Sequence, residues 1–176
     1  CTHMMVKEIV KQGDTVCDMT LGNGYDMRYL LERVDPGGTL YGFDIQEEAI
    51  LTCHQIGEEF PNTNIHLIHG SHERIQDINT SFSCILYNLG YLPGGNKEKI
   101  THPKTTFESL RKAIPKLRKG GAMLLTLYGG HDENCERKIL IHALKKLKGI
   151  DLYHFKKEGN HPMAPSTLLI QRKDHI

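Results

Sequence analysis

Residues 16–26 read VCDMTLGNGYD and run from Val16 to Asp26. This stretch predicts a short apolar strand with an acidic end, a tight glycine turn, and a helix over Asp26–Arg33. In α/β sheets such a unit brings backbone N–H groups and a helix N-terminus to the carboxyl end of a strand, where ligands bind. The carboxylates of Asp18 and Asp26 would repel a pyrophosphate, so they favour a ligand with a positively charged amino acid end.

The glycine turn also restricts the class of ligand. Gly22, Asn23 and Gly24 supply only the first half of a G-x-G-x-x-G dinucleotide fingerprint, because Met27 stands at the position of the third glycine. We therefore predict that the turn and its flanking acids bind S-adenosylmethionine. An NAD-dependent dehydrogenase is the disfavoured alternative.

Two later strand ends supply the rest of a nucleoside site. Asp44 ends a strand 20 residues after Gly24, and we predict that it accepts hydrogen bonds from ribose hydroxyls, with Gln46 near the ribose or adenine. The alternative is that Asp44 caps the helix that follows. Ser71 and His72 come after the third strand, and we expect them to contact the adenine by hydrogen bonding and stacking.

A metal site is the alternative for the histidines of this region, because His66, His69 and His72 are spaced by three residues. His66 and His69 fall within a predicted strand, where residues three apart face opposite sides of the sheet. We therefore predict no metal ion.

Strand and helix patterns alternate along the chain. This order predicts a mostly parallel, seven-stranded α/β sheet of the Rossmann-like type with helices on both faces, formed by residues 1–176 as one domain. No helix fits between Phe155 and Ser166, so we expect the last two strands to form an antiparallel hairpin. The predicted strands are Thr15–Met19, Thr39–Asp44, Ile65–His69, Ser83–Tyr87, Ala122–Tyr128, Ile150–Phe155 and Ser166–Arg172. The predicted helices are Asp26–Arg33, Gln46–Glu59, Lys104–Arg118 and Glu133–Leu147, with Gly120-Gly121 and Gly149 as stop signals.

The segment after the fourth predicted strand has the composition of a substrate loop. Asn88 and Tyr91 are the predicted catalytic residues, because an amide oxygen can accept the N–H bonds of an amine while an aromatic ring packs on the substrate. Asn88 is also expected to contact the cofactor, because this loop lies where the substrate would meet the methyl donor. Gly90, Gly94 and Gly95 would let the backbone approach the substrate closely, although a plain glycine loop is the alternative. Three residues of later loops are expected to line the same pocket, with loop packing as an equal alternative: Tyr128, His131 and Asn160.

Composition and charge restrict the cellular compartment and the partners expected for the protein. No apolar run approaches the ~20 residues needed to span a membrane, and five cysteines without a C-x-x-C pair predict a reduced, cytoplasmic protein. Residues 1–88 hold 5 Lys/Arg and 13 Asp/Glu (−8), whereas residues 89–176 hold 17 and 8 (+9). The basic half favours a polyanionic partner, and solvated helix faces are the alternative. The candidate phosphate contacts are Lys97, Lys99, Lys104, Arg111, Lys112, Arg118, Lys119, Lys156 and Lys157.

These motifs together resemble a bacterial family of class I methyltransferases labelled "rRNA methylase-like". The resemblance rests on the turn of residues 18–26, on Phe43-Asp44-Ile45-Gln46, on the segment of residues 88–95 with Lys97, and on Tyr128-Gly129-Gly130-His131. This chain departs from the family at Tyr25, where His is frequent, and at Asp132-Glu133, where glycines are frequent.

The resemblance implies an S-adenosylmethionine-dependent enzyme that methylates the aminomethyl group of the tRNA wobble uridine and produces 5-methylaminomethyl-2-thiouridine. The expected partners are tRNA, contacted at its anticodon region, and as an option a second copy of the chain. A small-molecule or rRNA methyltransferase and a non-catalytic RNA- or nucleotide-binding module remain as alternatives.

Overall fold

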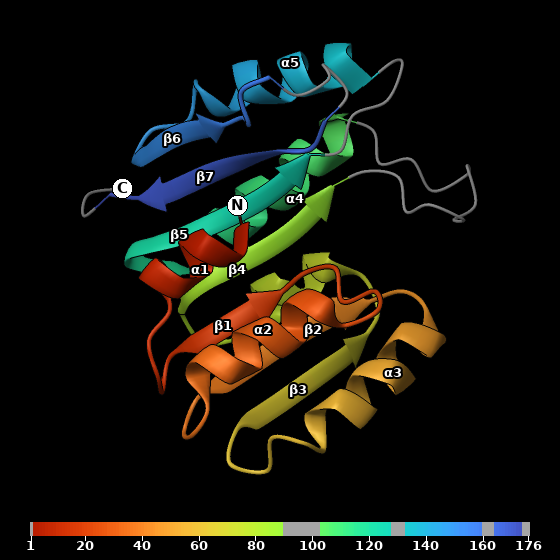
Figure 1. Ribbon diagram of the computed structural model, residues 1–176. Helices are drawn as coiled ribbons and strands as arrows, with labels where there is room; N and C mark the ends of the chain where they lie inside the picture. The colour runs from red at the N-terminus through yellow and green to blue at the C-terminus, as the bar shows by residue number, and fades with distance from the viewer. Residues whose placement is uncertain (1, 90–102, 128–132, 160–163, 174–176) are drawn as a thin grey trace.

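The computed structural model describes residues 2–89, 103–127, 133–159 and 164–173 (Figure 1). Its centre is one sheet of seven strands in the order β3-β2-β1-β4-β5-β7-β6. β7 is antiparallel to both of its neighbours, and the other paired strands are parallel. The predicted fold class is therefore confirmed. The strands are β1 (Thr15–Asp18), β2 (Thr39–Asp44), β3 (Asn64–His69), β4 (Phe82–Leu89), β5 (Leu117–Leu127), β6 (Ile150–Phe155) and β7 (Ser166–Arg172).

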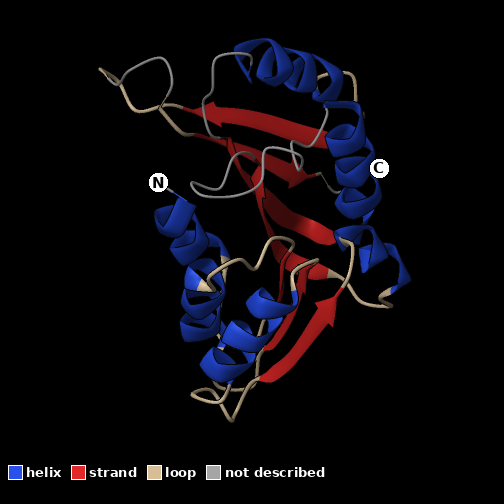
Figure 2. Cartoon of the chain, turned by 90° about the vertical axis from the view of Figure 1, so that its right-hand side faces the viewer, coloured by secondary structure: helices blue, strands red, loops and turns tan. Residues whose placement is uncertain are grey.

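Helices cover both faces of the sheet (Figures 1 and 2). One face packs against α1 (Thr2–Ile9), α2 (Tyr25–Val34) and α3 (Glu47–Gly57), and the other against α4 (Pro103–Ala113), α5 (Glu133–Leu144) and the 3-10 helix η1 (His72–Asp77). The period-two alternation of the central strands divides the apolar side chains between two cores. On β4, for example, Cys84 and Leu86 join the α1–α3 core, whereas Ile85 and Tyr87 join the α4–α5 core. In the part of the chain described, no helix is long and apolar enough to cross a bilayer.

The strand predictions hold to within a few residues, but two helix predictions need correction. The helix predicted over Lys104–Arg118 ends at Ala113, because Pro115 has no N–H to continue it and the chain passes through a short 3-10 helix, η3 (Ile114–Lys116), into β5. Gly120-Gly121 is not a helix stop but lies within β5, where the register with β4 shifts between Phe82 and Cys84. Gly120 has φ +73°, and a Cβ on Gly121 would lie 2.9 Å from the Phe82 carbonyl oxygen, so this bulge requires glycine.

Candidate active site

A pocket of about 450 Å³ opens at the carboxyl ends of β1, β2 and β4. Its walls are the glycine turn after β1, the end of β2, the start of η1 and the end of β4, which are the positions where open α/β sheets bind ligands. All the residues predicted to bind the cofactor line this pocket except Asp18: Gly22, Asn23, Gly24, Asp26, Asp44, Gln46, Ser71, His72 and Asn88.

The glycine turn is held in place by its neighbours. Gly24 precedes the first residue of α2 with φ +82°, and a Cβ there would lie 2.4 Å from Cδ1 of Ile56 on α3. Gly22 has φ +52°, so both glycines adopt the left-handed conformation that other residues rarely tolerate. The turn can therefore pack closely against α3 and present its backbone to the pocket.

Asp44 connects the turn to the next helix. Its Oδ2 accepts a hydrogen bond from the Gly22 N–H (2.9 Å), and its Oδ1 accepts one from the Gln46 N–H (2.8 Å). Gln46 is the N-cap residue of α3 and makes no side-chain capping bond, so Asp44 supplies the side-chain hydrogen bond at the start of this helix while it faces the pocket, and its geometry is compatible with both the ribose prediction and the capping alternative. Each carboxylate oxygen keeps a further lone pair, which can accept from a ligand hydroxyl.

Asp18 is completely buried below the turn and does not line the pocket. Its Oδ1 accepts from the Thr20 N–H (3.0 Å), and no residue in the described part of the chain donates to its Oδ2. Burial raises the pKa of the Asp18 carboxyl to about 7; the Thr20 N–H opposes this rise, and the nearby carboxylates of Asp26 and Asp44 add to it. Any action of Asp18 on a ligand therefore operates through charge or through the turn, not by direct contact.

A chain of hydrogen bonds fixes the side chain of Asn88 at the end of β4. Asn88 Nδ2 donates to Asp26 Oδ2 (2.7 Å), while Asp26 Oδ1 lies 2.7 Å from His3 Nε2 on α1. An ionised carboxylate only accepts, so the Asp26 contact defines which end of the amide is nitrogen and leaves Asn88 Oδ1 as a free acceptor among the described residues. The Asn88 N–H also donates to Thr20 Oγ1 (2.9 Å), which joins β4 to the glycine turn.

The sequence predictions missed His3, because no motif marks α1. The imidazole ring of His3 stacks on the ring of Tyr29 at a centroid distance of 4.2 Å. Asp26, which the sequence predictions assign to the cofactor, lines the pocket, and its two oxygens contact His3 and Asn88. A helix that begins at the second residue thus reaches the same site as the glycine turn.

His72, which also lines the pocket, forms a second hydrogen-bond network that is half-buried. Its Nε2 lies 2.8 Å from the Tyr87 hydroxyl and its Nδ1 lies 2.8 Å from Ser109 Oγ on α4. Burial lowers the pKa of His72, which favours the neutral ring, and burial raises the pKa of Tyr87 to about 12. Both ring nitrogens of His72 are therefore engaged within the protein, and only the ring surface is left for contact with a base. Ser71 Oγ accepts from the Glu73 N–H at the start of η1, and its O–H remains able to donate to a ligand.

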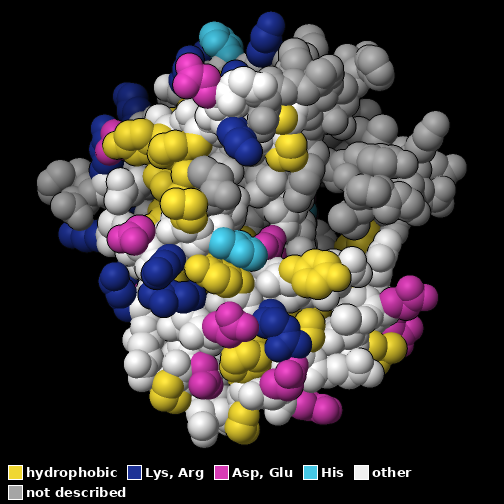
Figure 3. Space-filling model, in the orientation of Figure 1, with side chains coloured by type: hydrophobic (Ala, Val, Ile, Leu, Met, Phe, Trp, Pro, Cys, Tyr) yellow, Lys and Arg dark blue, Asp and Glu magenta, His cyan; other side chains and the backbone are white. Residues whose placement is uncertain are grey.

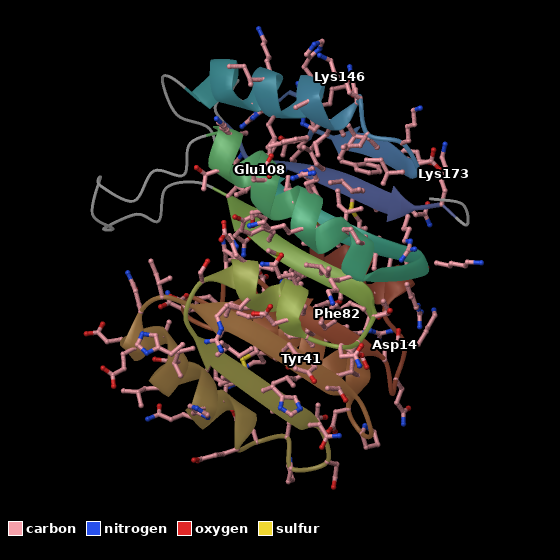
Figure 4. The ribbon with its side chains drawn as sticks, turned by 180° about the vertical axis from the view of Figure 1, so that it is seen from behind. Asp14, Tyr41, Phe82, Glu108, Lys146 and Lys173 are labelled. Carbon is pink, nitrogen blue, oxygen red and sulfur yellow. The ribbon has the colours of Figure 1, made fainter. Side chains whose placement is uncertain are left out.

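The three histidines do not converge on one point. His66 stacks on Tyr41 at 4.5 Å, and Tyr41 meets Phe82 edge-on at 5.8 Å on the face seen in Figure 4. His69 Nε2 contacts the Ile45 carbonyl oxygen (3.0 Å). Within residues 2–89, 103–127, 133–159 and 164–173, no group of three potential metal ligands occurs.

Most predicted substrate residues lie outside the described part of the chain: Gly90, Tyr91, Gly94, Gly95, Tyr128, His131 and Asn160. The strands that lead to them are described. β4 ends at Leu89 and β5 at Leu127, and Asn88 is the register partner of Thr126.

The basic residues of the second half are divided between the two ends of the sheet. Arg118 and Lys119 lie at the start of β5, at the opposite end of the sheet from the pocket, and Arg118 pairs with Asp14 (3.4 Å). Lys156 and Lys157 directly follow β6, which ends at the same edge as β4. Lys104 lies at the start of α4, which begins at that edge (Figure 1). Arg111 and Lys112 pair with Glu108 (3.0 Å) and Glu73 (3.6 Å), and Lys97 and Lys99 are outside the described residues.

Comparison with known proteins decides the family. Residues 40–171 match the model of a family described as "Putative rRNA methylase". The chain belongs to this family. A tRNA (mnm(5)s(2)U34)-methyltransferase from Arabidopsis thaliana, named as chloroplastic, is 33% identical to this methylase over an alignment of 187 positions, gaps included, which covers 98% of this chain and 68% of the plant protein.

Solved structures agree with this membership. A structure described as a putative rRNA-methylase from Clostridium thermocellum has a TM-score of 0.87 and 30% identity to this methylase, and the match covers 97% of this chain and 95% of that one. A methyltransferase from Streptococcus mutans, crystallised in complex with S-adenosylhomocysteine (SAH), has a TM-score of 0.82 and 25% identity with the same coverage. The resemblance inferred from the sequence and the predicted enzyme class are both confirmed.

Proposed function

We propose that this protein transfers a methyl group from S-adenosylmethionine to the aminomethyl nitrogen of the tRNA wobble uridine, which gives 5-methylaminomethyl-2-thiouridine. The observation that carries the proposal is the fixed amide of Asn88, which offers Oδ1 as an acceptor at the wall of the pocket. The plant relative with this named activity aligns with nearly the whole chain, which supports the same choice.

The residues of the pocket fit a nucleoside ligand with a cationic group. The volume of about 450 Å³ lies in the range of small-molecule sites. The carboxylate of Asp44 faces the pocket with spare acceptor capacity, and the buried carboxyl of Asp18 lies directly beneath the turn. S-adenosylmethionine, when bound, supplies a methyl group that its sulfonium has already activated for displacement.

Because the methyl group is already activated, the contribution of the protein is alignment of the incoming amine. Asn88 Oδ1 can accept one N–H of the amine and so orient its lone pair, while Asp26 prevents the amide from rotating. We propose Tyr91 as the ring that packs on the base, with Gly90, Gly94 and Gly95 as the close backbone. The amine must be neutral to attack, and its proton leaves to water, so no side chain is required as general base.

Replacement of Asn88 tests this role. For Asn88→Ala we expect kcat to fall by about 100-fold or more, because the orienting acceptor is lost, while the Kd for S-adenosylmethionine changes by less than about threefold. Methyl transfer to tRNA and calorimetry with the donor measure the two quantities. Asn62→Ala, which changes an exposed asparagine outside the pocket, is the matched control. Unchanged turnover in the Asn88 variant would contradict the role.

Transfer RNA would approach the carboxyl edge of the sheet, where Lys104, Lys156 and Lys157 lie. Ribosomal RNA is the competing acceptor, since the family description names it. Comparison of methyl transfer to tRNA, rRNA and free amines under one set of conditions distinguishes these acceptors. We expect transfer to tRNA alone, with RNA affinity that falls steeply as salt rises.

A further inference from the structure

One row of register partners runs across the sheet from the candidate active site to its edge. Asn88 pairs with Thr126, Thr126 with Thr167, and Thr167 with Phe155. Register partners place their side chains on the same face of a sheet. Two contacts identify this face as the one that carries α1 and α2: Asn88 bonds to Asp26 of α2, and Thr2 of α1 lies 3.3 Å from the hydroxyls of both threonines.

Phe155 therefore shares a face and a row with Asn88. Three strand spacings of about 4.8 Å separate them, or about 14 Å in all. Stacked nucleotides rise about 3.4 Å each, so this span corresponds to about four of them. A strand of RNA with one base at Asn88 would reach β6 within a few residues.

The sheet face at β6 is not covered by any described helix, as Figure 1 shows, and Figure 3 shows hydrophobic side chains gathered over β6 and β7. Tyr153 and Phe155 point to this face with 46% and 41% of their surface exposed, and their rings are 6.5 Å apart and tilted by 30°. Lys156 and Lys157 follow directly and are exposed. Asp151, the acidic residue on the same face of β6, lies at the start of this strand and pairs with Lys173 (3.1 Å).

We propose that Tyr153 and Phe155, together with Lys156 and Lys157, form a stacking platform for unpaired bases of the RNA substrate that flank the methylated nucleotide. Exposed aromatic rings bind unpaired bases through their π faces, and adjacent lysines bind the phosphates between them. This combination of aromatic and cationic groups fits a single-stranded RNA loop better than a protein partner, because lysine is depleted in the cores of protein–protein interfaces. The proposal rests on the proposed function, because it assumes an RNA substrate at Asn88.

The test is binding of an anticodon-type hairpin RNA that carries 2-aminopurine about four nucleotides from the target uridine, the separation of the platform from Asn88. Wild-type protein should quench the 2-aminopurine by stacking. Tyr153→Ala/Phe155→Ala should weaken hairpin binding by about 10-fold or more and abolish the quenching. Tyr153→Phe/Phe155→Tyr should retain affinity, because the rings remain.

A matched control is Leu51→Ala, which removes an apolar side chain of similar exposure (56%) from α3, outside this platform. Lys156→Gln/Lys157→Gln should reduce the salt slope of hairpin binding by about one to two units. Hairpin affinity within twofold of wild type in the double alanine variant would overturn the proposal. Sedimentation that shows a wild-type dimer, dissociated by the same variant with RNA binding intact, would also overturn it and identify the face as a self-association surface.

The binding readout needs no methyl transfer. If methyl transfer to the wobble uridine is not observed, the binding experiment still shows whether hairpin affinity depends on Tyr153 and Phe155. If instead the platform is wrong, the methylated nucleoside still forms while the alanine variant binds RNA as the wild type does.

Discussion

At the scale of single residues, the orientation of Asn88 depends on a contact from a helix remote in sequence. His3 reaches Asp26, and Asp26 holds the Asn88 amide. We therefore propose that His3 acts as a positioning residue. We expect His3→Ala to lower kcat by about 2- to 10-fold, the worth of one hydrogen bond, with the KM for tRNA and the Kd for the donor unchanged.

His3→Gln should restore most of this loss, since its amide can donate to Asp26 as the imidazole does. Met4→Ala on the same helix, where the side chain is 76% exposed, is the matched control. Steady-state kinetics measures all three variants. A loss in His3→Ala that appears in KM alone, or no rescue by Gln, would argue against positioning.

Asp18 predicts a pH dependence of stability. Its folded pKa of about 7 lies above its ordinary value near 4, so the folded state holds one more proton between these pH values than the unfolded state does. This group therefore makes the free energy of unfolding fall as pH rises from about 4 to about 7, by at most about 4 kcal/mol.

Urea titrations of donor-free protein at several pH values should show this fall, and Asp18→Asn should remove it. His72 has a lowered pKa and acts in the opposite sense in acid, so the relevant quantity is the difference between wild type and variant at each pH. A difference that does not change with pH would contradict the assignment to Asp18.

At the scale of elements, strand ends were predictable because apolar runs and acidic or glycine punctuation mark them. These ends meet at one edge of a parallel sheet, and this is why Gly22, Asp44 and Asn88 could be grouped before their contacts were known. The burial of Asp18 was not predictable. The sequence pattern marks Asp18 as the acidic end of β1 but does not tell whether its side chain points into the pocket or into the protein interior. α1 was missed because a short helix near the start of the chain carries no motif.

At the scale of the whole molecule, the row from Asn88 to Phe155 joins the donor pocket to the uncovered edge of the sheet. The sequence indicated a basic second half, but only the topology separates Lys156 and Lys157 at the pocket edge from Arg118 and Lys119 at the opposite end. The charge pattern therefore identified residues 89–176 as the basic half of the chain. The strand directions then identified which of its basic residues lie at the same edge of the sheet as the pocket.

The central claim is the identity of the methylated group. Transfer RNA that carries 5-aminomethyl-2-thiouridine at the wobble position is incubated with the protein and isotope-labelled S-adenosylmethionine, and its nucleosides are separated by mass spectrometry, with Asn88→Ala as the inactive control. The account predicts that the label appears in a wobble nucleoside heavier by one methyl group, 5-methylaminomethyl-2-thiouridine, and only with the wild-type protein. A label found in rRNA or in another tRNA nucleoside, with the wobble nucleoside unchanged, would contradict it.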